Sequence, residues 1–254
     1  MSDLWILAVG FGVMPFAALL LYAVRSIEPG RRGMAWGLLA GVIAFLALSH
    51  AMAFVLVDHP LLALLADDVS SALVAVVGLA IGTGVGWALF EGPLIRMESE
   101  RILWAAVAFL ALHSFGDGLV IGVGFVGVAG PGYRVDPVAT VATVVHRFAE
   151  GALVVLPALA ARWRPRLAFG LLFAGLLTVP GAYVPPALFD PIAGTGALAS
   201  LAVPMLFGAI EAGLGFILLV RGFLPMAASA GGPRWLAWST VGFIGISIIH
   251  FIVE

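Results

Sequence analysis

Cysteine and lysine are both absent from the 254-residue sequence, and charged residues make up only 10% of it. Without cysteine the chain cannot form a disulfide, and any metal site must use histidine, carboxylate, amide or hydroxyl ligands. Without lysine it cannot carry a retinal Schiff base. The net charge is only −2, so we expect no nucleic-acid partner.

Apolar residues fill 63% of the chain, whereas a soluble domain is about half apolar. They form continuous runs of roughly the 20 residues that a helix needs to cross a bilayer, and they do not alternate as barrel strands would. The sequence therefore predicts an all-α integral membrane protein, one transmembrane domain over residues 1–254, embedded in the lipid bilayer. The eight predicted transmembrane helices span residues 4–24, 35–57, 69–90, 102–127, 137–160, 167–188, 197–220 and 235–253.

Arginines gather in every second loop of this eight-span chain. These loops contain Arg25, Arg31, Arg32, Arg96, Arg101, Arg162, Arg164, Arg166, Arg221 and Arg234. The other loops are acidic, with Arg134 as their only arginine. The positive-inside rule then places both termini outside and predicts a multi-pass protein of the cell (cytoplasmic or inner) membrane. A count of seven or nine spans would destroy this pattern.

Two polar cassettes interrupt the apolar runs, HSFGDG at 113–118 and HRFAEG at 146–151. In each, a histidine and an acid lie four residues apart, which places them on one helix face, one turn from each other. Ionisable groups inside membrane helices are costly and usually functional. Two cassettes on successive helices are therefore expected to form two halves of one site.

The four side chains of the cassettes are His113, Asp117, His146 and Glu150. Two neutral imidazoles and two carboxylates suit zinc, and also iron, manganese or cadmium, and the cation offsets the cost of burying the acids. The alternative interpretation is a purely structural polar contact between helices. For the isolated His50 and His250, a structural or interfacial role is favoured. Glu211 is left open: it is expected to pair with Arg147, to carry a proton, or to be protonated.

The segments HSFGDGLVIGVGF at 113–125 and HRFAEGALVVLP at 146–157 resemble the fourth-span and fifth-span motifs of the ZIP (Zrt-/Irt-like) divalent metal transporters, as found in bacteria and archaea. The resemblance implies a 3+2+3 arrangement of eight helices with both termini outside. It also implies a metal site halfway through the membrane with His113, Asp117, His146 and Glu150 as ligands. Members of the family often form dimers, so a homodimer is one expected assembly.

The second metal site of that family is where this sequence departs from the pattern. Ser114 replaces the asparagine that often follows the fourth-span histidine, and Arg147 stands where a liganding side chain often follows the fifth-span histidine. Thr178 takes the place of a sixth-span glutamate. A guanidinium has donors but no acceptor and cannot bind a cation. The sequence therefore predicts a single metal, with Arg147 in place of the second.

The leading interpretation is a divalent metal permease, not an enzyme, that carries a zinc-like ion toward the cytoplasm as its substrate. One alternative is a transporter of a non-metal or proton-coupled substrate on the same scaffold, in which Arg147 binds an anion. The other is an intramembrane zinc hydrolase, although the chain lacks His-Glu-x-x-His, since Arg147 and Phe148 follow His146.

Overall fold

The computed structural model describes residues 29–55, 68–93, 95, 97–125, 137–161, 175, 177, 181 and 196–253. The predicted span 4–24 lies outside these residues, as does nearly all of 167–188. Within the described part every regular element is helical and there is no strand, so the all-α prediction is confirmed there. The elements are α2 (Pro29–Val55), α3 (Asp68–Glu91), α4 (Glu98–Phe125), α5 (Pro137–Ala160), α8 (Gly196–Leu218), η1 (Leu219–Phe223), α9 (Leu224–Gly231), η2 (Gly232–Arg234) and α10 (Trp235–Val253).

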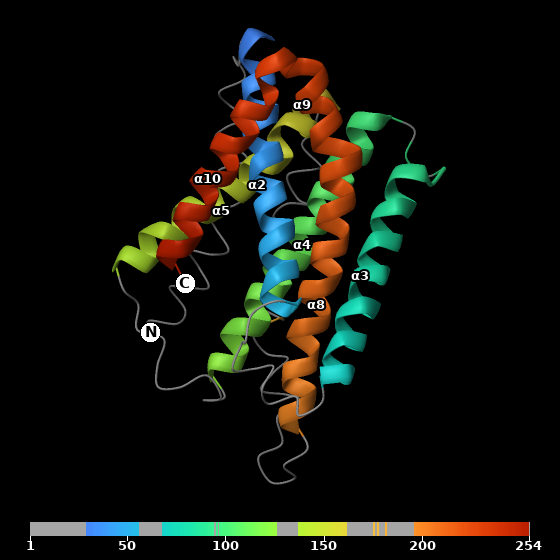
Figure 1. Cartoon of the computed structure of the whole chain (residues 1–254), viewed down its shortest axis with the longest axis vertical. Helices are drawn as coiled ribbons and strands as arrows, with labels where there is room; N and C mark the ends of the chain where they lie inside the picture. The colour runs from blue at the N-terminus through green and yellow to red at the C-terminus, as the bar shows by residue number, and fades with distance from the viewer. Residues whose placement is uncertain are drawn as a thin grey trace.

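Three stretches of the described helices are long and apolar enough to cross a membrane: Arg31–Ser49, Ala72–Glu91 and Met205–Phe251. The third is a hairpin and not one rod, because the chain turns at Gly232, whose φ of 54° favours glycine. α8 rises to this turn and α10 descends from it (Figure 1). The molecule is thus built from helices fit to span a membrane, and the total of eight spans stays a prediction.

Glycines let two pairs of helices approach until their backbones touch. On α3, Gly78 and Gly82 face α8: a Cβ added at Gly78 would lie 2.8 Å from the carbonyl oxygen of Leu206. On α2, Gly37 and Gly41 face α10 in the same way, and a Cβ at Gly37 would lie 2.7 Å from that of Trp238. Close approach at small residues is a main source of helix association in lipid.

The bundle is apolar both inside and outside. Its core joins α2, α4, α5 and α8 through fully buried side chains such as Leu46, Phe109, Leu153 and Leu214. The outer faces of α3 and α10 carry exposed leucine, valine, isoleucine and aromatic side chains, among them Trp87 and Phe251. Such faces would be an aggregation hazard in water, and they fit contact with lipid.

Five arginines of the described helices gather at one end of the bundle. The starts of α2, α4 and α10 and the ends of α3 and α8 all lie at the upper end in Figure 1. An added Cβ at Gly33, near the start of α2, would meet the backbone of Gly231, and Arg221 in η1 forms an ion pair with Glu91 at the end of α3. The arginines of this end are Arg31, Arg32, Arg101, Arg221 and Arg234. The sequence predicts this arrangement for these helices, because the arginines gather in every second loop.

Candidate metal centre

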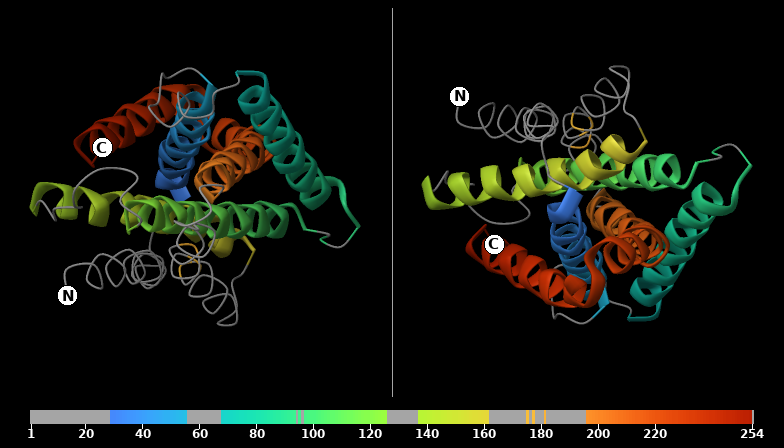
Figure 2. Two further views of the ribbon diagram at one scale, coloured as in Figure 1. Left: turned by 90° about the horizontal axis from the view of Figure 1, so that it is seen from below. Right: turned by 90° about the horizontal axis from the view of Figure 1, so that it is seen from above.

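The candidate site lies where α4 packs against both α5 and α8, a contact that the end-on views also show (Figure 2). α4 contributes His113 and Ser114, α5 contributes Glu150 and α8 contributes Glu211. All four are buried: His113 and Glu211 are 2% exposed, and Ser114 and Glu150 are fully covered. Polar groups at such depth in an apolar bundle are retained only where other polar groups meet them.

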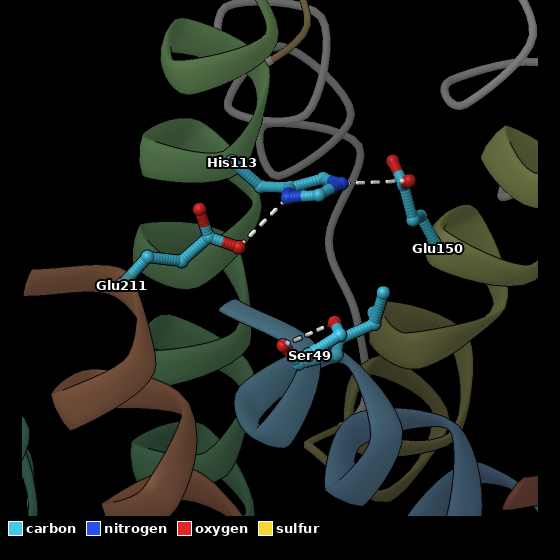
Figure 3. Close-up of polar contacts among 5 residues, drawn as sticks. Ser49, His113, Glu150 and Glu211 are labelled. Atoms are coloured by element: carbon cyan, nitrogen blue, oxygen red, sulfur yellow. Dashed lines mark hydrogen bonds and ion pairs between the residues drawn. The ribbon is translucent and has the colours of Figure 1, made fainter. Parts of the chain in front are cut away.

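His113 stands between two glutamates, one on each side of its ring (Figure 3). Its Nδ1 lies 2.7 Å from Oε1 of Glu211, and its Nε2 lies 3.0 Å from Oε1 of Glu150. One turn earlier on α4, the ring of Phe109 stacks parallel to the imidazole, with centroids 6.1 Å apart and planes 5° apart. The orientation of the imidazole is therefore fixed at both nitrogens and against Phe109.

The number of protons in this triad follows from its geometry. A neutral imidazole has one N–H donor and one acceptor nitrogen, yet His113 faces carboxyl oxygens with both. Either an imidazolium donates to two carboxylates, or a neutral ring donates to one carboxylate and accepts from a protonated carboxyl. The two contacts therefore hold at least two protons among the three groups.

The structure brings two of the four predicted ligands, His113 and Glu150, into contact across two helices. Asp117 and His146 lie on the same helices, one turn after His113 and one turn before Glu150, but their side chains lie outside the described part of the chain, as does that of Arg147. Thr178 also lies outside the described residues. The predicted four-ligand set thus stays a prediction.

The described side chains alone do not make a complete metal site. Among them, no group of three or more histidines and carboxylates converges on one point. The reason is visible in the triad: Glu150 and Glu211 bind opposite edges of the His113 ring, so they face different points in space. A metal at one edge would meet one carboxylate and the ring, and it would need further ligands from elsewhere.

Sequence reasoning did not find the partner of Glu211. It left open a pair with Arg147, a proton-carrying role or protonation, and it did not name His113, which the structure places next to Glu211. The two residues are 98 positions apart, so no helical spacing relates them. Of the isolated histidines, His250 packs edge-on against Phe45 at 5.1 Å, and the side chain of His50 lies outside the described part.

A second polar region lies at the arginine end, at the π-helix η1 that directly follows α8. The π-helix η1 carries Arg221, whose guanidinium pairs with Glu91 and lies 5.4 Å above the ring of Trp87. Beside it opens a cavity of about 520 Å³. Its lining consists of Phe90, Glu98, Arg101, Val220, Arg221 and Pro225.

Comparison with known proteins adds no assignment, since no family model matches the chain and no curated protein matches it.

Proposed function

We propose that the protein is a divalent transition-metal permease of the zinc-transporting kind, built on a ZIP-like scaffold. The observation that carries the proposal is the buried contact between His113 and Glu150, 3.0 Å long, which joins the two cassettes of the sequence. The resemblance of those cassettes to the fourth-span and fifth-span motifs of ZIP transporters supports the same assignment. No enzymatic step is proposed.

The spacing of His113 and Glu150 suits two ligands of one ion. Ligands about 2.0–2.1 Å from a tetrahedral zinc ion lie about 3.3–3.4 Å from each other. Nε2 and Oε1, at 3.0 Å, would need to separate by only a few tenths of an ångström. The ion would then take the place of the proton that the two atoms share. Asp117 and His146, one turn away on the same helices, are the proposed remaining ligands.

Arg147 follows His146 on α5 and is proposed to supply the positive charge that a second metal would otherwise bring. A guanidinium is permanently charged and cannot act as a ligand. Ser114, adjacent to His113 and fully buried, is a weaker ligand than the asparagine of the family motif. We therefore propose a site for a single ion.

The depth of the triad agrees with transport through the middle of a bilayer. His113 follows Arg101 by 12 residues on α4, which is about 18 Å at 1.5 Å per residue. Glu211 precedes Arg221 by 10 residues, or about 15 Å. The hydrocarbon core is about 30 Å thick, so a site 15–18 Å from the arginine end lies close to the midplane.

The orientation and assembly of the proposed permease follow from the same charges. The arginine end would face the cytoplasm by the positive-inside rule, in the cytoplasmic or inner membrane. Eight spans in a 3+2+3 arrangement with both termini outside would complete the fold, and a homodimer is the expected assembly. The ion would move from the outer face to the cytoplasm, with zinc, iron, manganese and cadmium as the candidates.

Uptake of divalent ions into proteoliposomes of the purified chain tests this proposal. Saturable zinc uptake should be lost in Glu150→Gln, which retains a hydrogen-bonding side chain of the same size, and also in Glu150→Ala. Glu100→Gln, a change in the first turn of α4, is the matched control and should transport normally. If no divalent ion enters, or if Glu150→Gln transports like the unaltered protein, the proposal is wrong.

One observation favours a second candidate, a transporter of protons or of a proton-coupled substrate. Glu211, His113 and Glu150 form a continuous hydrogen-bonded chain from α8 through α4 to α5, and chains of acids and histidines carry protons in pumps and transporters. A pH-sensitive dye inside metal-free proteoliposomes distinguishes the two. Acidification in chelator that is lost in His113→Gln would favour the proton transporter.

A further inference from the structure

Of the two glutamates at His113, Glu211 makes the shorter hydrogen bond, at 2.7 Å, although it belongs to neither cassette. It reaches the ring from α8, 98 positions further along the chain, and is 2% exposed. Gly116, one turn after His113 on α4, lies beside it: a Cβ added there would be in ordinary van der Waals contact, 3.7 Å, with Oε2 of Glu211. The packing of α4 against α8 thus brings this carboxylate to the Nδ1 edge of the imidazole.

Glu150 and Glu211 cannot play the same role, because they contact different nitrogens of the His113 ring. Nδ1 and Nε2 point away from each other, and Figure 3 shows Glu211 at one edge and Glu150 at the other. A metal bound at Nε2 beside Glu150 would lie on the far side of the ring from Glu211. Glu211 therefore cannot complete the coordination of that metal while it holds Nδ1.

A carboxylate at the second nitrogen of a liganding histidine has a known physical effect. It accepts the N–H of that nitrogen, fixes the tautomer and the ring orientation, and raises the basicity of the nitrogen that binds the metal. Loss of such a partner typically weakens metal binding by about 10-fold to 100-fold. The stack on Phe109 restrains the ring plane but cannot select between tautomers, so the carboxyl groups at the two nitrogens make the selection, and Glu211 is the nearer of the two.

We propose that Glu211 is the positioning residue of the metal site: it accepts the Nδ1–H of His113 and so presents Nε2 to the metal beside Glu150. This inference rests on the proposed function for its purpose, and it makes α8 a part of the site. Glu211 is not a ligand in this assignment.

The tautomer of His113 tests the inference without any metal. Long-range ¹⁵N–¹H spectra of the full chain, labelled at histidine and held in nanodiscs, report which ring nitrogen carries a proton, and His113→Gln assigns the signal. The unaltered protein and Glu211→Gln, whose amide oxygen still accepts, should show a proton on Nδ1. In Glu211→Leu that proton should move to Nε2, which faces Glu150. An unchanged Nδ1 proton in Glu211→Leu would overturn the inference.

Cobalt binding gives the second measurement on the same samples. Glu211→Leu should bind Co²⁺ about 10-fold to 100-fold more weakly, while the positions and intensities of the d–d absorption bands stay those of the unaltered site. Glu211→Gln should recover part of the affinity, and Glu100→Gln should match the unaltered protein. Altered bands in Glu211→Leu would make Glu211 a ligand and refute the assignment, as would unweakened binding.

The two measurements keep the proposals apart. Loss of the Nδ1 proton in Glu211→Leu, in a chain that binds no metal, would refute the permease and show only that Glu211 sets the tautomer of His113. Metal transport with the same tautomer in every variant would support the permease and refute the positioning role. The melting temperature in nanodiscs identifies any variant that fails to fold. If Glu211→Leu fails, Glu211→Gln, of nearly unchanged shape, is compared with the unaltered protein, and its Co²⁺ affinity should be the lower of the two.

Discussion

The contact between α3 and α8 predicts different effects on stability for the same substitution at two nearby glycines. Gly82 faces α8: a Cβ added there would lie 2.7 Å from the carbonyl carbon of Ile210 and closer still to its oxygen. Ordinary van der Waals contact begins at 3.4 Å, and the Cβ would lie 2.7 Å from this carbon. The helices would therefore have to part by at least 0.7 Å to accommodate it. Gly84, two residues later on the same helix, has nothing within 4 Å of the corresponding position.

Overpacking of a close-packed interface costs about 1–3 kcal/mol, and alanine gains up to about 1 kcal/mol over glycine in a helix. Gly82→Ala should therefore lower the free energy of unfolding by about 1–3 kcal/mol, less any propensity gain. Gly84→Ala should leave it unchanged or raise it by up to about 1 kcal/mol. Unfolding in mixed detergent micelles, followed by helical circular dichroism, measures both. Equal effects at the two positions would refute backbone contact between α3 and α8.

Three further predictions concern the site and the arginine end. Phe109→Ala should lower the free energy of unfolding by about 3–5 kcal/mol, because a fully buried ring is lost, and it should weaken Co²⁺ binding by loosening His113; normal stability in a melt would contradict this. Arg221→Gln should change the free energy of unfolding by at most about 1 kcal/mol, since its pair with Glu91 is about 40% exposed; a larger loss in the same detergent titration would show a stronger pair. Arg147→Asp should raise bound metal from one ion to two per chain in elemental analysis, and an unchanged ratio would count against Arg147 as the substitute for a second ion.

The sequence predicted the helices well where a breaker or a sharp change in polarity marks an end. The predicted ranges 137–160 and 235–253 coincide with Pro137–Ala160 and Trp235–Val253. By contrast, α2 begins six residues before the predicted 35, and α4 begins four before 102. Hydropathy marks where a chain becomes apolar, whereas a helix begins at its cap. Charged first turns such as Glu98–Arg101 are helical but polar, and acids there favour the helix dipole.

The core of the candidate site was only partly predictable. The pairing of His113 with Glu150 followed from two cassettes on successive helices, because a repeated spacing is visible in one sequence. The contact of His113 with Glu211 had no such signal, since the two lie on helices far apart in the chain. The π-helix at Leu219–Phe223 was also missed, because one extra residue in a turn leaves an apolar run looking the same.

Mechanically, the glycine contacts determine which parts of the molecule can slip. Helices whose backbones interlock, as α3 with α8 at Gly82 or α2 with α10 at Gly41, cannot slide past each other without collision, so each pair behaves as one stiff body. α4 meets α8 through side chains, such as Phe109 against Gly215, and such contacts can exchange one rotamer for another. Movement of α4 against α8 therefore requires only side chains to rearrange at these contacts. The hydrogen bond between His113 and Glu211 joins the two helices across the same contact and would have to break in such a movement.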